Sequence, residues 1–253
     1  SMNIRKAVIT TAGKGTRLYP VTRIIPKVML PLLETPVIQL VVQEALQAGI
    51  EEIILIVSPE GNMIRDYFDN SPGPWQGKIQ YIIQPEAKGL GDAIYCARES
   101  VGNEPFLVLF GDSVFLRENP SRKLIDNMIL TGHAALAVQE IPDEDIPRRG
   151  VLDAETLGDS RYRIKGMVEK PSLEEAPSNL GFIARAIFHP SIFNALAQVS
   201  PDKKGEIQLT PAVCQLLSLE TIEAIAIKED RLDIGNPSSY TKAILAYAQF
   251  KNL

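Results

Sequence analysis

The sequence predicts an α/β protein with a doubly wound, mostly parallel β-sheet and a second lobe of mixed strands and helices. Two observations lead to this prediction. Over residues 6–110, short apolar runs rich in β-branched residues alternate with amphipathic runs, and such apolar runs are typical of strands buried on both faces. Beyond residue 110 the order becomes less regular. Repeated strand–helix–strand units need right-handed crossovers, which place successive strands parallel in one sheet.

In the first half, expected strands and helices alternate along the chain. The first helix is expected to begin at Pro36, because proline suits a first helical turn, and to end at Gly49, because glycine is favoured just past a helix. The expected strands comprise residues 6–10, 51–58, 78–84 and 105–110. The expected helices comprise residues 36–49, 61–70 and 89–100.

The second half combines strands and helices in a mixed order. The expected helices comprise residues 121–132, 190–199, 207–219 and 238–250. The expected strands comprise residues 133–141, 161–170, 179–188 and 221–228. No flexible linker or internal repeat interrupts the chain, so we expect a single domain over residues 2–253, in which two parts meet near residue 115.

The composition is that of a globular protein with a sizeable core, at 45% hydrophobic and 23% charged residues. The formal net charge of −5 disfavours nucleic acid and acidic membranes as partners, so a bound anion needs a local cluster of cations. No apolar run approaches the roughly 20 residues of a membrane span, and we expect no membrane partner. Cys96 and Cys214 lack metal-like spacing and are expected to be reduced thiols in a cytoplasmic protein.

The segment 10–32, TTAGKGTRLYPVTRIIPKVMLPL, combines glycines and cations directly after the first expected strand. Ligands of parallel sheets bind at the carboxyl ends of the strands, so this loop lies in a favoured place. Gly13 and Gly15 allow a ligand close to the main chain, whose N–H groups can hold a phosphate. Arg17 and Lys27 supply positive charge. Taken alone, the loop predicts a phosphate site, with an ordinary glycine turn and solvated cations as the alternative.

Two familiar phosphate-binding motifs do not fit this loop. The P-loop needs four residues between its first glycine and its Gly-Lys pair, and AGKGT lacks that spacing. The dinucleotide fingerprint needs a third glycine where Leu18 stands, and its acidic residue at the end of the second strand is missing as well. The loop therefore indicates another class of phosphate site.

Polar residues stand at the ends of other expected strands. Asp112 follows a buried strand directly and so belongs to the same sheet edge as the glycine loop, although an aspartate there is often only a turn residue. Gln84 offers both a donor and an acceptor, which suits a pyrimidine edge. Glu169 and Lys170 end a later strand, where an exposed ion pair is the alternative to a ligand site.

AGKGTRLYPVTRIIPKVMLPL resembles the signature of nucleotidyltransferases that make nucleoside-diphosphate sugars, and it most resembles that of the bacterial UTP–glucose-1-phosphate uridylyltransferases. The similarity extends over nearly the whole chain, with FGDS, VEKP and RLDIGNP in the family's order. It implies a Rossmann-like, glycosyltransferase-A-like fold that transfers a uridylyl group from UTP to glucose 1-phosphate with Mg²⁺, giving UDP-glucose and pyrophosphate. It also implies a nucleotide-binding part over about 2–115, a sugar- and metal-binding part over about 116–253, and a homo-oligomer (dimer or tetramer).

The resemblance assigns roles to the residues at matching positions. Arg17 and Lys27 are expected to hold the triphosphate, and Gln84 to read the base. The expected catalytic residues are Arg17, Lys27, Asp112 and Lys170. The expected nucleotide-binding residues are Ala12, Gly13, Gly15, Thr16, Gln84 and Gly89. The expected sugar-binding residues are Gly150, Glu169, Lys170, Asn179 and Gly181, and the expected Mg²⁺ ligands are Asp112 and Asp233.

The chain also departs from the family pattern. The segment between Asp69 and Lys78 is shorter than usual, Val28 replaces an acidic residue, and Asp92 stands where a neutral residue or histidine is common. One alternative is the same chemistry with another base or sugar, such as dTTP, because a single methyl group is worth only about 1–3 kcal/mol of discrimination. A second is a non-catalytic paralogue that binds sugar nucleotide and regulates a partner. Retention of both expected aspartates argues against the second alternative.

Overall fold

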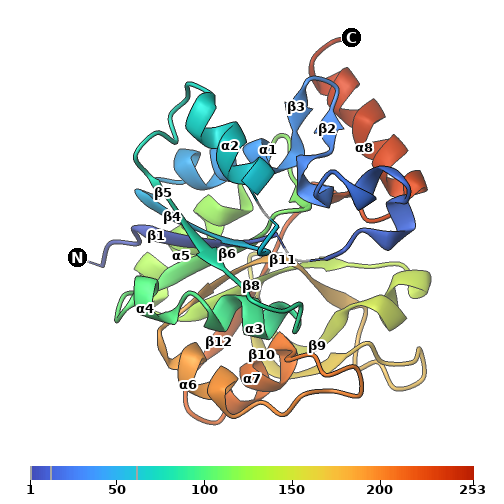
Figure 1. Ribbon diagram of the computed structural model, residues 1–253. Coiled ribbons are helices and arrows are strands. Elements are labelled where there is room, and N and C mark those ends of the chain that lie inside the picture. The colour runs from blue at the N-terminus through green and yellow to red at the C-terminus, as the bar shows by residue number, and fades with distance from the viewer. Residues whose placement is uncertain (1, 12, 61) are drawn as a thin grey trace.

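A nine-stranded β-sheet runs through the computed structural model, which describes residues 2–11, 13–60 and 62–253 (Figure 1). The strand order is β5-β4-β1-β6-β11-β8-β12-β10-β9. The strands are, in chain order, β1 (Lys6–Thr10), β4 (Glu52–Val57), β5 (Ile79–Ile83), β6 (Phe106–Phe110), β8 (Ala134–Glu140), β9 (Gly150–Gly158), β10 (Arg161–Glu169), β11 (Leu180–Phe188) and β12 (Ile222–Ala226). Two short ribbons pair β2 (Pro31–Leu32) with β3 (Thr35–Pro36), and β7 (Ser113–Val114) with β13 (Leu232–Asp233).

The two halves of the sheet differ in strand direction. β5, β4, β1 and β6 pair in parallel, as repeated strand–helix–strand units require. β11 pairs antiparallel with β6 and β8, β8 pairs in parallel with β12, and β10 pairs antiparallel with β12 and β9. β11 and β10 therefore run opposite to the other strands of the sheet. The predicted doubly wound α/β fold with a mixed second lobe is confirmed.

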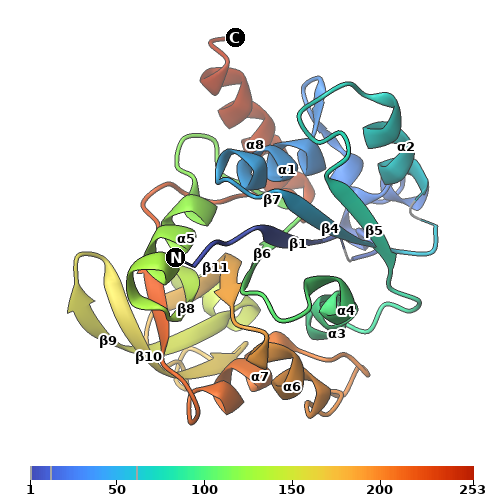
Figure 2. The same ribbon diagram turned by 90° about the vertical axis from the view of Figure 1, so that its left-hand side faces the viewer.

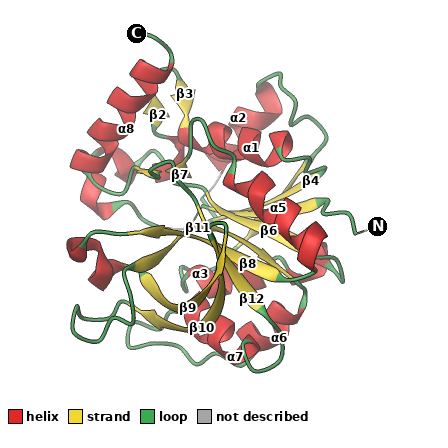
Figure 3. Cartoon of the chain, turned by 180° about the vertical axis from the view of Figure 1, so that it is seen from behind, coloured by secondary structure: helices red, strands yellow, loops and turns green. Residues whose placement is uncertain are grey.

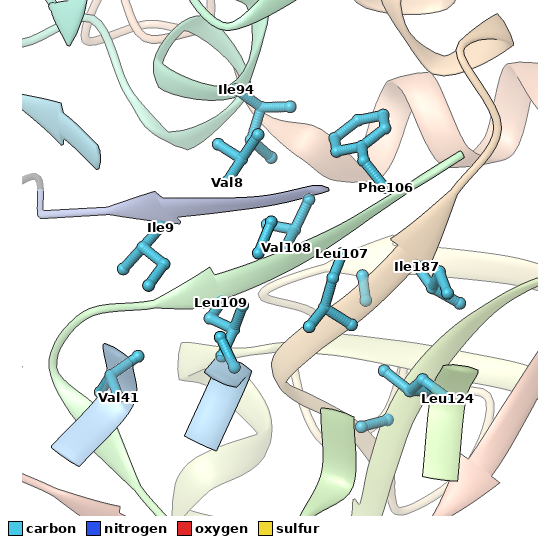
Figure 4. Close-up of a cluster of buried hydrophobic side chains, with 14 of the residues drawn as sticks. Val8, Ile9, Val41, Ile94, Phe106, Leu107, Val108, Leu109, Leu124 and Ile187 are labelled. Atoms are coloured by element: carbon cyan, nitrogen blue, oxygen red, sulfur yellow. The ribbon is translucent and has the colours of Figure 1, made fainter. Parts of the chain in front are cut away.

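Helices cover both faces of this sheet. The described α-helices are, in chain order, α1 (Val37–Gln47), α2 (Asn62–Asn70), α3 (Leu90–Tyr95), α4 (Arg98–Val101), α5 (Pro120–Thr131), α6 (Ser191–Ala197), α7 (Leu209–Leu216) and α8 (Pro237–Phe250). α1 and α5 pack together over one face, while α3, α6 and α7 lie over the other (Figure 2). β1 is buried on both faces, because Val8 points toward Ile94 of α3 and Ile9 toward Val41 of α1 (Figure 4).

The closing helix α8 packs against the β2–β3 ribbon rather than against the centre of the sheet (Figure 3). The Tyr240 hydroxyl donates to the Pro31 carbonyl at 2.6 Å, and Tyr247 Oη donates to Thr35 Oγ1 at 3.2 Å. The ribbon directly follows the turn of 3-10 helix at Lys27–Met29. The end of the chain thereby supports the loop that carries Lys27.

Two of the longer elements differ from the sequence-based expectation, and the short strands β2, β3, β7 and β13 were not expected either. The helix expected over 89–100 is split into α3 and α4 at Cys96–Ala97, although neither glycine nor proline marks the break. β9 was not expected, because its second half carries polar and exposed residues rather than an apolar run. β9 forms a hairpin with β10 through Asp159 and Ser160, both at positive φ. A two-residue turn with positive φ at both positions matches the twist of a hairpin.

One sheet continues across the position expected to separate the two parts of the domain, because β6 pairs with β11. The division near residue 115 stays a prediction.

Cys96 and Cys214 are free and half-buried, which agrees with their expected reduced state. None of the described helices combines the length and the apolar character needed to cross a membrane.

Candidate active site

The carboxyl ends of β1, β4, β5 and β6 meet at one edge of the sheet, because these strands are parallel and in register. Thr10 is level with Phe110, and Gly111 N donates to the Thr10 carbonyl at 2.7 Å. The glycine loop, Gln84 and Asp112 follow these strands. Parallel strand direction thus brings together predicted residues that lie far apart in the sequence.

Three neighbouring hollows lie along this edge. The first has a volume of about 500 Å³ and is lined by Gly13, Gly89, Asp112 and Lys170, among others. The second, of about 550 Å³, shares Gly13 with the first and adds Lys27 and Gln84. The third, of about 610 Å³, shares Lys170 with the first and adds Arg17 and Asp233. The predicted catalytic residues therefore line three hollows that share lining residues.

Lys27 and Asp112 form the central ion pair of the site. Lys27 Nζ lies 2.7 Å from Asp112 Oδ2, with the lysine side chain 13% and the aspartate side chain 27% exposed. Burial raises the pKa of a carboxyl, but the charge and hydrogen bond of Lys27, together with the charge of Arg231, hold the pKa of Asp112 below its ordinary value. Asp112 is therefore an anion at neutral pH, as a metal ligand must be.

The glycine loop places Lys27 by close packing. Gly15 has φ of +63°, and a Cβ at this position would lie 3.1 Å from the Thr22 side chain. Thr22 Oγ1 donates to the Gly15 carbonyl at 2.6 Å, and a Cβ at Gly13 would lie 3.3 Å from Lys27 Nζ. Only residues without a Cβ fit these positions unchanged. Thr16 opens the following 3-10 turn, and Ala12 lies outside the described residues.

Gln84, which is expected to read the base, is 6% exposed. Its Nε2 donates to Asp92 Oδ2 at 2.8 Å and to the Gly89 carbonyl at 3.3 Å. A Cβ at Gly89 would lie 2.9 Å from the Ile207 carbonyl oxygen. Ile207 N donates to the Lys88 carbonyl at 2.7 Å, so the second half of the chain holds this loop in place.

Among the residues expected to bind the sugar, Glu169 ends β10 and Lys170 follows at φ +48°. Glu169 Oε2 accepts a hydrogen bond from Thr210 Oγ1 at 2.6 Å, and Lys170 N donates to the Arg149 carbonyl at 2.8 Å. Gly150 is paired with Glu169 across the hairpin. The strand end thus aims Lys170 into the hollow that also holds Asp112.

Asn179 and Gly181 contact Ile141, the residue after β8, rather than the hollows of the site. The Asn179 carbonyl accepts from Ile141 N at 2.9 Å, and a Cβ at Gly181 would lie 2.7 Å from Ile141 Cδ1. Neither residue lines the three hollows as the structure describes them. Their role in sugar binding stays a prediction.

Asp233 lies opposite Ser113, the residue after Asp112, because β13 pairs with β7. Its Oδ2 lies 3.2 Å from Arg231 Nη2 and 4.0 Å from Arg149 Nη2. Within residues 2–11, 13–60 and 62–253, no group of three or more His, Cys, Asp or Glu side chains is arranged to hold a metal ion. Two carboxylates nevertheless suit Mg²⁺, which completes its octahedron with water and substrate phosphate oxygens.

Arg185 was missed by the sequence analysis, although a lone arginine within the apolar run NLGFIARAIF was a signal. Its side chain is 0% exposed and forms a bidentate pair with Glu44, at 2.8 and 2.9 Å. It also donates to the Phe110 and Ser113 carbonyls at 3.4 and 2.8 Å. These two carbonyls flank Asp112, so the buried guanidinium holds the turn on which Asp112 stands.

Arg149 and Arg231 were also missed. Both line the third hollow and both face Asp233. The only signal was their position, since Arg149 directly precedes Gly150 and Arg231 stands two residues before Asp233. They add fixed positive charge where Arg17 and Lys170 already lie, which makes this hollow suited to phosphate groups.

The chain matches the family model described as "Nucleotidyl transferase" over residues 6–249. It is 38% identical to the UTP–glucose-1-phosphate uridylyltransferase of Bacillus subtilis, over 97% of this chain and 91% of that protein. It is 39% identical to the Staphylococcus haemolyticus protein of the same name, over 97% and 92%.

Solved structures show the same architecture. A UDP-glucose pyrophosphorylase in complex with UDP-glucose superposes with a TM-score of 0.92 at 34% identity, covering 98% of this chain and 99% of that one. A UTP-bound enzyme of the same kind from Acinetobacter baumannii has a TM-score of 0.88 at 30% identity, with 97% and 94% covered.

Proposed function

The chain belongs to the nucleotidyl transferase family, and we propose that it transfers a uridylyl group from UTP to glucose 1-phosphate, giving UDP-glucose and pyrophosphate. One structural observation carries the proposal. The hollow around Asp112 is lined both by the glycine and base-side loops of the parallel half and by Lys170 of the mixed half. A site with room for two phosphorylated substrates side by side is what this transfer requires.

The reaction is an in-line displacement at the α-phosphorus of UTP. A phosphate oxygen of glucose 1-phosphate forms the new bond to phosphorus, and the bond to the bridging oxygen breaks, so that pyrophosphate leaves with the electron pair. Such transfers depend on positioning and charge neutralisation more than on covalent chemistry. Lys27 and Arg17 are proposed to hold the triphosphate, and Lys170 the sugar phosphate.

Asp112 and Asp233 are the proposed ligands of Mg²⁺. Their support is the β7–β13 pairing, which sets Asp233 opposite Ser113, the residue after Asp112. When bound, Mg²⁺ supplies positive charge to the phosphate oxygens. Lys27 already pairs with Asp112, so this lysine keeps the carboxylate ionised and ready for the metal.

Glu169 is proposed to accept hydrogen bonds from the sugar hydroxyls, and Gly150, Asn179 and Gly181 are proposed to contribute to sugar binding on the strength of the family resemblance. A cytoplasmic homo-oligomer forms part of the same proposal and rests on the family resemblance. The absence of nucleic-acid and membrane partners from the proposal rests on the net charge of −5.

A pyrophosphate-release assay over a grid of nucleoside triphosphates and sugar 1-phosphates tests the function. UTP with glucose 1-phosphate is expected to give the highest kcat/KM. A preference for dTTP would replace uridylyl by thymidylyl transfer. No release with any pair would contradict an enzymatic role and favour a sugar-nucleotide-binding regulator.

Lys170→Met tests the sugar-phosphate role, with Lys165→Met as its matched control. Lys165 is an exposed lysine on β10, the strand that Lys170 directly follows. Lys170→Met should raise KM for glucose 1-phosphate and leave KM for UTP nearly unchanged, since the positive charge faces one substrate only. Equal behaviour of the two variants would remove Lys170 from the proposed site.

A further inference from the structure

The amide nitrogen of Gln84 is fully used inside the protein. It has two hydrogens, and the structure supplies two acceptors for them, Asp92 Oδ2 at 2.8 Å and the Gly89 carbonyl at 3.3 Å. A carbonyl oxygen accepts and never donates, and an ionised carboxylate behaves in the same way. Both partners can therefore form a hydrogen bond only with Nε2 of the amide and not with Oε1.

The oxygen end of Gln84 is consequently the end offered to the second hollow, which this residue lines. Uracil presents a donor, N3–H, between two carbonyl oxygens, and thymine presents the same pattern. Cytosine has an acceptor at N3 instead. An amide oxygen held in this orientation pairs with the N3–H of uracil and faces a lone pair at the N3 of cytosine.

We propose that Asp92 is a specificity-determining positioning residue, which selects uracil over cytosine by fixing the orientation of the Gln84 amide. The inference rests on the proposed function in that it takes the base to lie at Gln84. Asp92 does not contact the base in this scheme. It acts through Gln84, whose burial at 6% exposure leaves the amide little access to water as a substitute partner.

The surroundings of Asp92 support a role beyond folding. Among the described residues, the side-chain hydrogen bond with Gln84 is the one that the Asp92 carboxylate makes. Asp92 lies in the first turn of α3, where any acid gains a modest stabilisation from the helix dipole. A purely structural acid would be replaceable without any change in base preference.

The test compares UTP with CTP in wild type, Asp92→Ala and Asp92→Asn. Calorimetric binding constants and kcat/KM are measured for both nucleotides. Without Asp92 the amide can turn and offer Nε2 to the cytosine N3, so the UTP-to-CTP preference should fall by about 10-fold in Asp92→Ala, as expected for one misplaced hydrogen bond. The UTP-to-CTP preference of Asp92→Asn should lie between those of wild type and Asp92→Ala, because the asparagine amide can pair with Gln84 in either orientation.

Gln84→Ala supplies the second arm. If Asp92 acts through Gln84, adding Asp92→Ala to Gln84→Ala should change the nucleotide preference no further. Glu99→Ala, at an exposed acid on the adjacent helix α4, is the matched control and should keep the wild-type preference. A wild-type preference in Asp92→Ala, or an equal shift in the Gln84→Ala background, would overturn the inference.

Misfolding of Asp92→Ala and failure of the proposed function give different results. If Asp92→Ala does not fold, Asp92→Asn decides, and a wild-type preference there overturns the inference. If the wild-type protein releases no pyrophosphate with any substrate pair, the proposed function fails. The binding constants for UTP and CTP still test the orientation of Gln84 in that case.

Discussion

The parallel half of the sheet and its mixed half build the site by different means. In the parallel half, Gln84 and Asp112 stand in loops directly after strands, and strand direction alone brings them to one edge. In the mixed half, Glu169 and Asp233 depend on pairings with distant segments, through Thr210 and β7. The first half thus places its polar groups by strand direction, while the second half places Glu169 and Asp233 by contacts with distant segments.

The two halves meet where β6 pairs with β11, and changes at this junction are expected to lower the stability of the fold. Changes in the parallel half are expected to lower turnover, and changes in the mixed half to lower the affinity for one substrate. Arg185→Met, Lys27→Met and Thr210→Val test these three expectations in turn.

Arg185→Met should have the largest effect, because it removes one partner of a buried ion pair at the junction. Breaking such a pair typically costs about 3–5 kcal/mol, since the remaining charge stays buried and unpaired. The free energy of unfolding, measured by urea denaturation, should fall accordingly. Glu44→Met combined with Arg185→Met should recover part of the loss. Urea midpoints equal to wild type in the single variant would show that the junction does not depend on this pair.

Lys27→Met should lower kcat by about 10²–10³, the range seen when one preorganised group that stabilises developing charge is removed. Steady-state pyrophosphate release gives kcat, and circular dichroism checks the fold. Lys165→Met again serves as the control, because its side chain is exposed on β10. A turnover within a few-fold of wild type would remove Lys27 from the catalytic role.

Thr210→Val tests the mixed half. The change keeps the side-chain shape but removes the hydroxyl that donates to Glu169 Oε2 at 2.6 Å. Hydrogen bonds to charged groups are worth about 1.5–3 kcal/mol, so KM for glucose 1-phosphate should rise by about 10-fold or more. KM for UTP should stay near the wild-type value. Parallel changes in both KM values would contradict the separation of the two sides.

Glu104 provides the smallest expected effect, at the opposite end of the sheet from the site. Hydrogen bonds from Arg5 and Lys6, with their charges, lower the pKa of Glu104 from 4.5 to about 2. A folded-state pKa below the unfolded one contributes stability that is present above about pH 4.5 and is lost as the pH falls toward 2. The side chains are partly exposed, so the contribution should be at most about 1 kcal/mol.

The measurement is the difference in free energy of unfolding between wild type and Glu104→Gln as a function of pH. This difference should shrink as the solution is acidified, and activity near neutral pH should be the same in both proteins. A difference that does not change with pH would contradict the lowered pKa.

The two regions also differ in how far their sequence revealed them. The positions of Asp112 and Gln84 were predictable because each stands within two residues of the end of a strand, and the local pattern marks where that strand ends. Gly13 and Gly15 have positive φ, the backbone freedom for which glycines are expected in such a loop. The fold class followed from the strand–helix alternation that β1 to β6 retain.

The remainder needed the tertiary structure. β9 has no apolar run, and its pairing with β10 depends on the turn at Asp159 and Ser160. The partner of Arg185 lies 141 residues away, so no local pattern identifies it. The hydrogen bond between Gln84 and Asp92 spans 8 residues, and no local pattern pairs a glutamine at a strand end with an acid of the following helix.

The central claim is that the two halves form one site for two substrates. Phosphorus NMR of the protein mixed with UTP, glucose 1-phosphate and Mg²⁺ tests it most directly. Our account predicts that the diphosphate signals of UDP-glucose and the signal of pyrophosphate grow together in equal amounts, and that neither grows when one substrate is left out. Pyrophosphate or phosphate released from UTP without glucose 1-phosphate, or no new signals with both substrates present, would contradict it.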